Sequence, residues 1–393
     1  MKKILAIFAA LLLLPAVLAV DTGAGIGIGI TPEEFPPHIW LCDSRIVTDD
    51  AVESGRDTDV SDELYERIEN YAFEGEQIAL DVLVMDKNKI EEVEDVVVTI
   101  GSSFGVGQDI EVECAESSGP SQIPTECNAR LGEEQLTEFD EDTMDYYECI
   151  FTVETPNSMY GEYFVTVEVI GVDGEATIDE TEYWFLNPAI ALSVDGSVSF
   201  DEVRPGSVAY STPVLVGNDA DEGSGVLLDM FISGTDFYDP ASSGAKCPTT
   251  NHLKLSQDLR SKASLGADVS SGATYSEQCD IDSWINTAAG IGEDNHDHLC
   301  YYATNGAYSS ADAGNADAEG YRPIVYSDVF TRDFYNDAEI ISNDALVISG
   351  IAYDAGNVLT PGAEIAIEFK LGLPEPCVGD FSDGDIFFWG EAV

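Results

Sequence analysis

The chain has 393 residues, 44% of them hydrophobic, and its 75 acidic and 16 basic residues give a formal net charge of −59 at pH 7. A surface this negative repels nucleic acid and anionic lipid, so both are excluded as partners. Aromatic and β-branched residues are too frequent for a disordered chain, and the length predicts two domains of ordinary size.

Two interpretations of the acidity stay open. Acids spread over every exposed face are typical of a protein from a saline habitat, whereas clustered carboxylates bind Ca2+ and can join subunits. Both predict a stability that rises with added ions, because counter-ions weaken the self-repulsion of a compact acidic molecule.

The first residues predict export. Two lysines precede an apolar run, and Val17 and Ala19 complete the pattern of a secretory signal peptide over residues 1–19. The alternative is a permanent N-terminal anchor, but the run is shorter than a spanning helix needs and no stop-transfer segment follows. We therefore expect a secreted protein, at the extracellular cell surface, with no membrane insertion after removal of the signal.

Residues 20–35 hold a segment of alternating glycine and isoleucine and a linker. Ile26, Ile28 and Ile30 would share one face of a strand, and glycines would form the other face. Glycine in a strand costs about 0.5 to 1 kcal/mol in chain entropy, so its repeated use favours close approach of another backbone. Two hypotheses follow: the segment is the first strand of its own domain, or it is an assembly strand that completes the sheet of a neighbouring copy.

Residues 36–187 are expected to form an Ig-like antiparallel β-sandwich. Short segments of alternating polarity, separated by turn residues, are typical of that fold. A segment at 61–71 is instead expected to be a helix or a loop. The predicted strands span 38–47, 76–86, 93–101, 109–115, 146–154, 162–171 and 176–186.

The eight cysteines predict disulfides, because the count is even, the chain is expected to be exported and no spacing matches a zinc site. Each half of the chain holds four: Cys42, Cys114, Cys127 and Cys149, then Cys247, Cys279, Cys300 and Cys377. If bridges stay within each half, three connectivities are open for each set. The polar segment between Cys114 and Cys127 favours that pair, which leaves Cys42 with Cys149.

Residues 188–393 are expected to form a second β-sandwich of the Ig-like or jelly-roll kind, beginning at the Asn187-Pro188 seam. Predicted strands span 190–200, 209–218, 225–237, 345–354, 363–373 and 384–393. Residues 238–338 are rich in Ser, Ala, Gly and Asp, so we interpret them as a long insertion fastened by disulfides. Cys377 is expected to bridge back to this insertion.

Two short stretches resemble known families. Tyr147, two residues before Cys149, resembles the tyrosine corner of Ig-like domains. The run around Pro205, Gly206 and Asn218 resembles camelysin or TasA-type sandwich domains and Ig-like modules of archaeal surface-layer proteins. This second resemblance implies a cell-surface layer or fibre and brings no catalytic residue with it.

Two metal sites are suggested by residue type and spacing. Asn315, Asp317 and Glu319 alternate before Gly320, as in the first half of a calcium loop, so Ca2+ is the one cofactor that the sequence suggests. His296 and His298 would share a face in a strand and could hold a transition metal. The alternative for both is a solvated acidic loop.

No catalytic motif is present, so we expect a protein that is not an enzyme. The predicted function is structural or adhesive: a surface-layer or filament subunit whose partners are other copies of itself, or other cell-surface proteins and glycans. The alternative is a monomeric carbohydrate- or peptide-binding module that uses Tyr301, Tyr302, Tyr321 and Tyr335 as an exposed platform. A secreted hydrolase is the third hypothesis.

Overall fold

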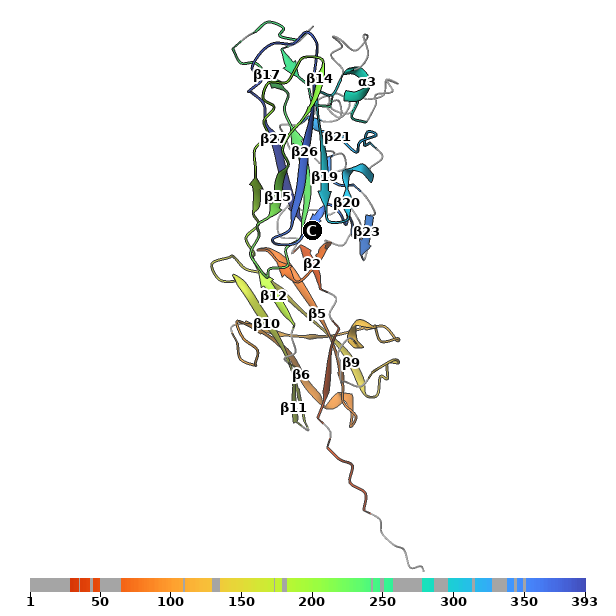
Figure 1. Ribbon diagram of the computed structural model, residues 1–393. Helices are drawn as coiled ribbons and strands as arrows, with labels where there is room; N and C mark the ends of the chain where they lie inside the picture. Colours follow the sequence, from red (N-terminus) through yellow and green to blue (C-terminus); the bar gives the residue numbers. More distant parts are fainter. Residues whose placement is uncertain are drawn as a thin grey trace, which may run out of the picture. The chain divides into compact units, whose positions relative to one another are not determined.

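The computed structural model separates the chain into two units, Met1–Phe35 and Pro36–Val393. Figure 1 traces the chain, and in the described residues the regular secondary structure is almost all β-strand. The structure describes residues 29–34, 36–42, 45–49, 65–108, 110–128, 135–172, 174–178, 182–241, 243–247, 251–256, 278–285, 296–312, 315–326, 338–342, 345–348 and 351–393.

The described residues between His38 and Leu186 include the strands of two six-stranded sheets. The first sheet runs β3-β2-β5-β9-β8, with β1 also paired to β5; the second runs β4-β12-β10-β6-β7, with β11 also paired to β10. Every pairing in them is antiparallel except β12 with β4. The strands of the first sheet are β1 (His38–Cys42), β2 (Ile46–Asp49), β3 (Tyr65–Ile68), β5 (Glu76–Met85), β8 (Ala115–Ser117) and β9 (Met144–Thr152). Those of the second are β4 (Tyr71–Ala72), β6 (Val93–Gly101), β7 (Ile110–Glu113), β10 (Gly161–Gly171), β11 (Gly174–Ile178) and β12 (Tyr183–Leu186).

The core of this region comes from the alternation of its long strands. In β5, every second residue from Ile78 to Val84 is buried, and Val98 of β6 and Val167 of β10 belong to the same apolar cluster. A period of two places these side chains on one face of each strand, where the two sheets bury them against each other. The predicted all-β, sandwich-type fold is therefore confirmed.

The expectation of a helix or loop at 61–71 is wrong where the structure describes that segment. Residues 65–68 form strand β3, which pairs with β2. Arg67 of β3 is buried and donates to the Glu76 carboxylate at 2.9 Å, and its guanidinium lies 4.5 Å from the centre of the Tyr71 ring. These tertiary contacts override the local helical pattern.

The disulfide pairing predicted for the first half is also wrong. Cys42 pairs with Cys127, and Cys114 pairs with Cys149. Cys114 lies where the chain passes from β7 of the second sheet to β8 of the first, and its N–H donates to the Val96 carbonyl in the second sheet. Cys149 lies in β9 of the first sheet, so this bridge links the two sheets, a relation that sequence spacing does not reveal.

The described residues between Leu192 and Ala392 include the strands of the remaining sheets. A seven-stranded sheet runs β13-β15-β26-β19-β20, with β14 also on β26 and β21 also on β19. A four-stranded sheet runs β22-β16-β25, with β27 also on β16. The strands of the seven-stranded sheet are β13 (Leu192–Asp195), β14 (Ser207–Tyr210), β15 (Val214–Asn218), β19 (Leu299–Asn305), β20 (Tyr308–Ser309), β21 (Arg322–Pro323) and β26 (Glu364–Leu373). Those of the four-stranded sheet are β16 (Leu228–Gly234), β22 (Val325–Tyr326), β25 (Val358–Leu359) and β27 (Ile386–Ala392).

Short elements complete the described chain. Two hairpins stand outside the larger sheets: β17 (Phe237–Tyr238) with β18 (His252–Leu253), and β23 (Ala345–Ile348) with β24 (Ile351–Asp354). The short helices are α3 (Ile281–Ile285), η1 (Ile90–Glu92), η2 (Glu126–Asn128) and η3 (Ser310–Asp312). Within the described part of the chain, no helix is both long and apolar enough to span a membrane.

The interpretation of 238–338 as an insertion without sandwich strands is wrong in one respect. Strand β19 lies inside this range and pairs along its length with β26, in the middle of the seven-stranded sheet. The disulfides do fasten the range: Cys247 pairs with Cys377, as predicted for Cys377, and Cys279 pairs with Cys300.

The chain leaves the first two sheets at Asn187, the residue of the predicted seam. Asn187 has a φ of 51°, and its side chain donates to the carbonyls of Glu154 and Met159 at 2.8 and 2.6 Å. It also accepts the N–H of Glu74 at 2.8 Å. Asparagine tolerates this left-handed backbone better than most residues, and its amide satisfies three backbone groups at the turn.

Candidate functional site: carboxylates around a buried lysine

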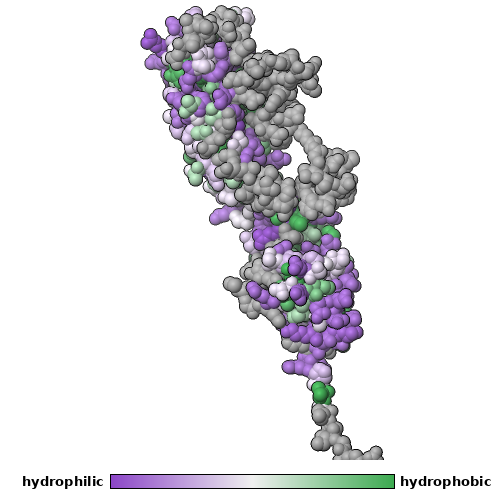
Figure 2. All heavy atoms as spheres, turned by 90° about the vertical axis from the view of Figure 1, so that its right-hand side faces the viewer, coloured by the Kyte–Doolittle hydropathy of each residue, from purple (hydrophilic) through white to green (hydrophobic). Residues whose placement is uncertain are grey.

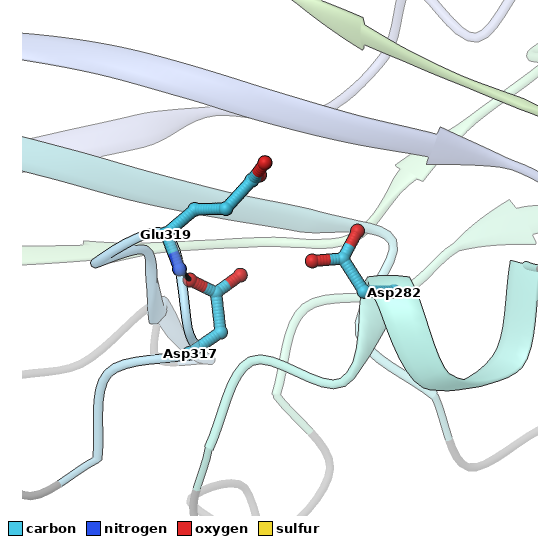
Figure 3. A group of neighbouring side chains, drawn as sticks. All are labelled: Asp282, Asp317 and Glu319. Carbon is cyan, nitrogen blue, oxygen red and sulfur yellow. Dashed lines mark hydrogen bonds between the residues drawn. The ribbon is translucent and has the colours of Figure 1, made fainter.

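A buried lysine stands at the centre of a group of three carboxylates. The Lys370 side chain has no exposed surface, and its Nζ donates to Asp282 at 2.7 Å, to Asp317 at 3.1 Å and to Glu319 at 2.7 Å. Figure 3 shows the three carboxylates converging, Asp282 from helix α3 and the other two from one loop. We call these four residues the lysine-centred cluster.

Opposing effects act on the ammonium. Burial lowers the pKa of Lys370, but hydrogen bonds to Asp282, Glu319 and Asp317 outweigh it and raise the pKa above its ordinary value. The same ammonium lowers the pKa of Glu319. The lysine is therefore held as a cation, and it balances one of the three negative charges around it.

The loop that carries two of these acids is shaped by its own hydrogen bonds. One oxygen of Asp317, Oδ1, accepts the N–H groups of Glu319 and Tyr321, each at 2.9 Å; the first of these is the dashed line in Figure 3. Gly320 follows with a φ of 94°, and a Cβ there would lie 2.7 Å from the Tyr302 ring. Glycine is thus required by both backbone and packing. Asp317 Oδ2 remains for the lysine.

Tyrosines surround the cluster. Lys370 Nζ lies 5.1 Å from the centre of the Tyr321 ring, which adds a cation–π contact. The Tyr210 hydroxyl donates to Glu319 at 3.1 Å, and the Tyr321 hydroxyl donates to Glu368 at 3.2 Å. Burial, and then the Glu368 carboxylate, raise the pKa of Tyr321, so this hydroxyl stays protonated.

The exposed tyrosine platform expected from the sequence is wrong for two of its members. Tyr301 is 1% exposed and Tyr321 is 7% exposed. Tyr301 uses its hydroxyl internally, donating to the Ile340 carbonyl at 3.0 Å. Tyr302 is partly buried, with its ring 5.7 Å from that of Tyr321, and Tyr335 lies outside the described residues.

The residues of the predicted Ca2+ site are only partly brought together. Carboxylate oxygens of Asp282, Asp317 and Glu319 lie within 4.8 Å of one another, a donor set of the type that binds Ca2+. Asp282 was not predicted, and Asn315 is not part of the group. Asn315 Oδ1 is buried and accepts no hydrogen bond within the described residues. The ammonium of Lys370 already contacts all three acids, so the chain supplies its own cation here.

The predicted histidine pair flanks a tryptophan. The rings of His296 and His298 lie 5.7 and 5.3 Å from that of Trp284. His296 Nδ1 is 2.6 Å from Asp280, and His298 Nδ1 accepts the Lys254 N–H at 3.0 Å. Burial lowers the pKa of His298 to about 4, so this imidazole is neutral at neutral pH. Because the His298 ring is neutral and its Nδ1 accepts a hydrogen bond, its Nε2 carries the proton, so neither nitrogen of His298 is free to bind a metal in this arrangement.

A second group of acids, not predicted, lies around β16. We call Asp229, Glu339, Asp354 and Glu391 the acid-only cluster. Burial raises the pKa of Asp229 to about 6 despite a hydrogen bond from Asn357, and nearby Glu391 and Asp354 raise it further. Burial and a hydrogen bond to Asp354 hold the pKa of Glu339 well above its usual range, although Arg322 partly opposes this. Asp229 and Glu339 therefore retain protons at pH values where isolated acids would lose them.

The assembly strand lies mostly outside the described residues, including Ile26 and Ile28. Gly29 and Ile30 are described and belong to no strand. Ile30 is 83% exposed, and a Cβ added to Gly29 would meet nothing within 4 Å.

Comparisons with known proteins add no family to this description. No family model matches the sequence, and a search of curated proteins finds no relative. The four disulfides are themselves typical of proteins that fold in an oxidising, extracellular environment.

Proposed function

We propose that this chain is a secreted structural or adhesive protein, a subunit of a cell-surface layer or filament that assembles through β-strand contacts with the support of cations. The observation that carries this proposal is an apolar edge strand on a strongly acidic protein. Its support also includes the all-β framework, the disulfides and the acidity of the surface. Figure 2 shows hydrophilic residues over much of the coloured part of one face, with smaller hydrophobic patches.

The apolar edge is β13. It pairs with β15 and, within the described residues, ends the strand order of its sheet. Ile190, Val194 and Val198, in β13 and on either side of it, are 47%, 54% and 41% exposed. Natural edge strands are usually protected by charge, proline or a covering segment, because an open edge pairs readily with another strand. Here the one charged residue of the strand is Asp195.

The partner that we propose for this edge is the Gly/Ile segment of a second copy, residues 24–30. This segment carries no charge in a chain with a net charge of −59, so it can approach another acidic molecule without adding repulsion. Main-chain hydrogen bonds would give affinity, and the isoleucines would contact the exposed valines. Because donor and acceptor are different surfaces, such a contact can repeat without closing and yield a polymer.

Cations would support this assembly by reducing repulsion between subunits. Electron microscopy and sedimentation velocity across a range of protein, salt and Ca2+ concentrations test the proposal. We expect filaments or sheets that grow with protein concentration and with added ions. A strictly monomeric protein under all these conditions would contradict the proposal and favour the monomeric binding module.

Two changes identify the strands involved. Deleting residues 24–30 should leave a folded monomer, and Val194→Lys should weaken assembly because it places a charge on the edge strand. Val378→Lys is the matched control, since Val378 is 72% exposed outside any strand. Loss of folding on deletion would instead show that the segment is a strand of its own domain. Equal effects of the two lysine substitutions would exclude β13 as the acceptor.

A further inference from the structure

The lysine-centred cluster has the geometry of a condensation site between an amine and a carboxyl group. Lys370 Nζ lies 3.1 Å from Asp317 Oδ2, and the side chains of these two residues are 0% and 7% exposed. Two backbone N–H groups, at 2.9 Å each, contact the other oxygen of the same carboxyl group. Such donors polarise a carbonyl and stabilise the oxyanion that forms when a nucleophile adds to it.

Of the three acids, Asp317 is the suited acceptor. Asp282 and Glu319 are 46% and 50% exposed, so water solvates both carboxylates, whereas the Asp317 carboxyl group is buried and accepts two backbone N–H groups. Glu319 is instead placed as a proton relay, because its carboxylate lies 2.7 Å from the amine and its backbone N–H contacts Asp317.

We propose that Lys370 and Asp317 condense to an intramolecular isopeptide bond. The Nζ–Cγ bond forms and the Cγ–Oδ2 bond breaks. The ammonium gives up two of its three protons, which Glu319 accepts in turn and passes to the departing Oδ2, and this oxygen leaves as water. Glu319 ends as a carboxylate, nothing is oxidised or reduced, and no co-reactant is needed.

The closeness of the amine and the carboxyl group in the folded chain favours this condensation. Groups fixed in a reactive orientation reach effective molarities of about 10⁵ to 10⁸ M, which offsets the barrier that two free reactants would face. The scarcity of the neutral amine makes the step slow, so the bond would form after the chain has folded and assembled the site.

The surroundings also fit the product. The amide oxygen keeps both of its N–H donors, and the Glu319 carboxylate, 2.7 Å from Nζ, is placed to accept the remaining amide N–H. Asp282 and Glu319 lose a cation, but their exposure lets water replace it. The link would join residues 53 positions apart and fix the 315–321 loop onto β26.

A neighbouring disulfide already fixes the segment that leads into helix α3 onto the same sheet. Lys370 is the direct cross-strand partner of Cys300, whose disulfide to Cys279 ties the chain leading into α3 to the sheet. The two links would lie side by side and fasten the two segments that cover this face. This inference does not depend on assembly, so it can fail while the proposed function holds, and the reverse.

Intact mass spectrometry of the purified full chain tests the inference. With all four disulfides formed, we expect a mass lower by one water than that of the uncondensed chain. Proteolysis should yield a branched peptide that joins Lys370 to Asp317. An uncondensed mass after prolonged incubation of folded protein, with unlinked Lys370 and Asp317 peptides, would overturn the proposal.

Variants separate the chemistry from folding. Lys370→Arg keeps the charge but cannot form the same amide, so it should fold, as judged by circular dichroism, and show no loss of water. Glu319→Gln should slow the mass change at least tenfold, whereas Lys246→Arg, at a lysine paired with Asp239, should leave it unchanged. Loss of water that persists in Lys370→Arg would place the condensation elsewhere and contradict the assignment.

Discussion

The lysine-centred cluster and the acid-only cluster both bring carboxylates close together, but the repulsion between these carboxylates is reduced in different ways. Both gather carboxylates in the second half of a highly acidic chain. In the first, an ammonium contacts three acids and lowers the pKa of Glu319. In the second, Arg322 offsets the repulsion only in part, and burial raises the pKa of Asp229, Glu339 and Glu391.

The difference shows that this protein stabilises closely spaced acids either with a cation built into the chain or with protons taken from solvent. The first arrangement is insensitive to pH around neutrality, because the lysine stays charged. The second depends on pH, because its protons leave as the solution becomes more alkaline. Each cluster can therefore be perturbed separately.

The largest expected effect comes from removing the built-in cation. Lys370→Met leaves three carboxylates facing one another, and breaking a buried ion pair from one side costs about 3 kcal/mol or more in free energy of unfolding. Urea denaturation at pH 7 measures it, with wild-type protein whose intact mass shows that Lys370 and Asp317 are not yet linked as the reference. The control is Lys246→Met, whose partly exposed pair with Asp239 should cost less than about 1 kcal/mol. Similar losses in the two variants would contradict a special role for Lys370.

In the acid-only cluster, removing a charged group should stabilise the protein, whereas removing the Lys370 ammonium should destabilise it. A folded-state pKa raised above the unfolded value gives stability that is complete below the unfolded pKa and lost as pH rises through the folded pKa. For Asp229 that window runs from about 4 to about 6. Asp229→Asn should therefore stabilise the protein by about 2 kcal/mol at pH 8 and hardly at all at pH 4.

Thermal denaturation between pH 4 and 8 measures this difference. Asp201→Asn, at an exposed acid, is the control and should shift the melting temperature little at either pH. Stabilisation by Asp229→Asn that is equal at both pH values would show that packing, not charge, is responsible.

Calcium tests whether a cation from solution can replace the ammonium of the lysine-centred cluster. In Lys370→Met the three carboxylates, within 4.8 Å of one another, should accept Ca2+ in place of the ammonium. We expect millimolar Ca2+ to stabilise this variant by about 1 kcal/mol more than it stabilises the wild type. Adding Asp317→Ala to the variant should abolish the difference, and a difference that survives would locate the ion elsewhere.

The smallest effect concerns the rim of the lysine-centred cluster. Tyr210→Phe removes the hydroxyl that donates to Glu319 but keeps the ring, which lies 5.8 Å from that of Tyr321. Because Tyr210 is 49% exposed, water can replace the lost bond, and we expect a change below about 0.5 kcal/mol in urea denaturation. A cost near that of Lys370→Met would mean that the rim, not the ammonium, organises the site.

Periodicity predicted the fold where one face of a strand is buried and the other is not. Strand β5 alternates between buried and partly buried residues over most of its length, and it was found. Strand β19 was missed because the first three residues of Leu299–Asn305 are all buried, which removes the alternation. The segments that bury its outer face come from distant parts of the sequence, including helix α3.

The candidate site could be predicted only where its residues are close in sequence. Asp317 and Glu319 were found because they alternate before a glycine, but Asp282 and Lys370, 88 residues apart from each other, were not. One signal was present: a lysine within the apolar run of β26, where a charge needs a buried partner. No such signal marks the acid-only cluster, because a chain with 75 acids contains too many acidic residues for sequence alone to single out four of them.

The bridge between Cys114 and Cys149 affects how the first half of the chain would respond to mechanical load. Tension applied along the chain passes through the sulfur atoms, so the 35 residues of separation between them cannot be drawn out. Because the same bond spans both sheets, shear cannot slide one sheet past the other without cleaving it. A reductant should therefore lengthen the molecule under force at this point, which single-molecule stretching can measure.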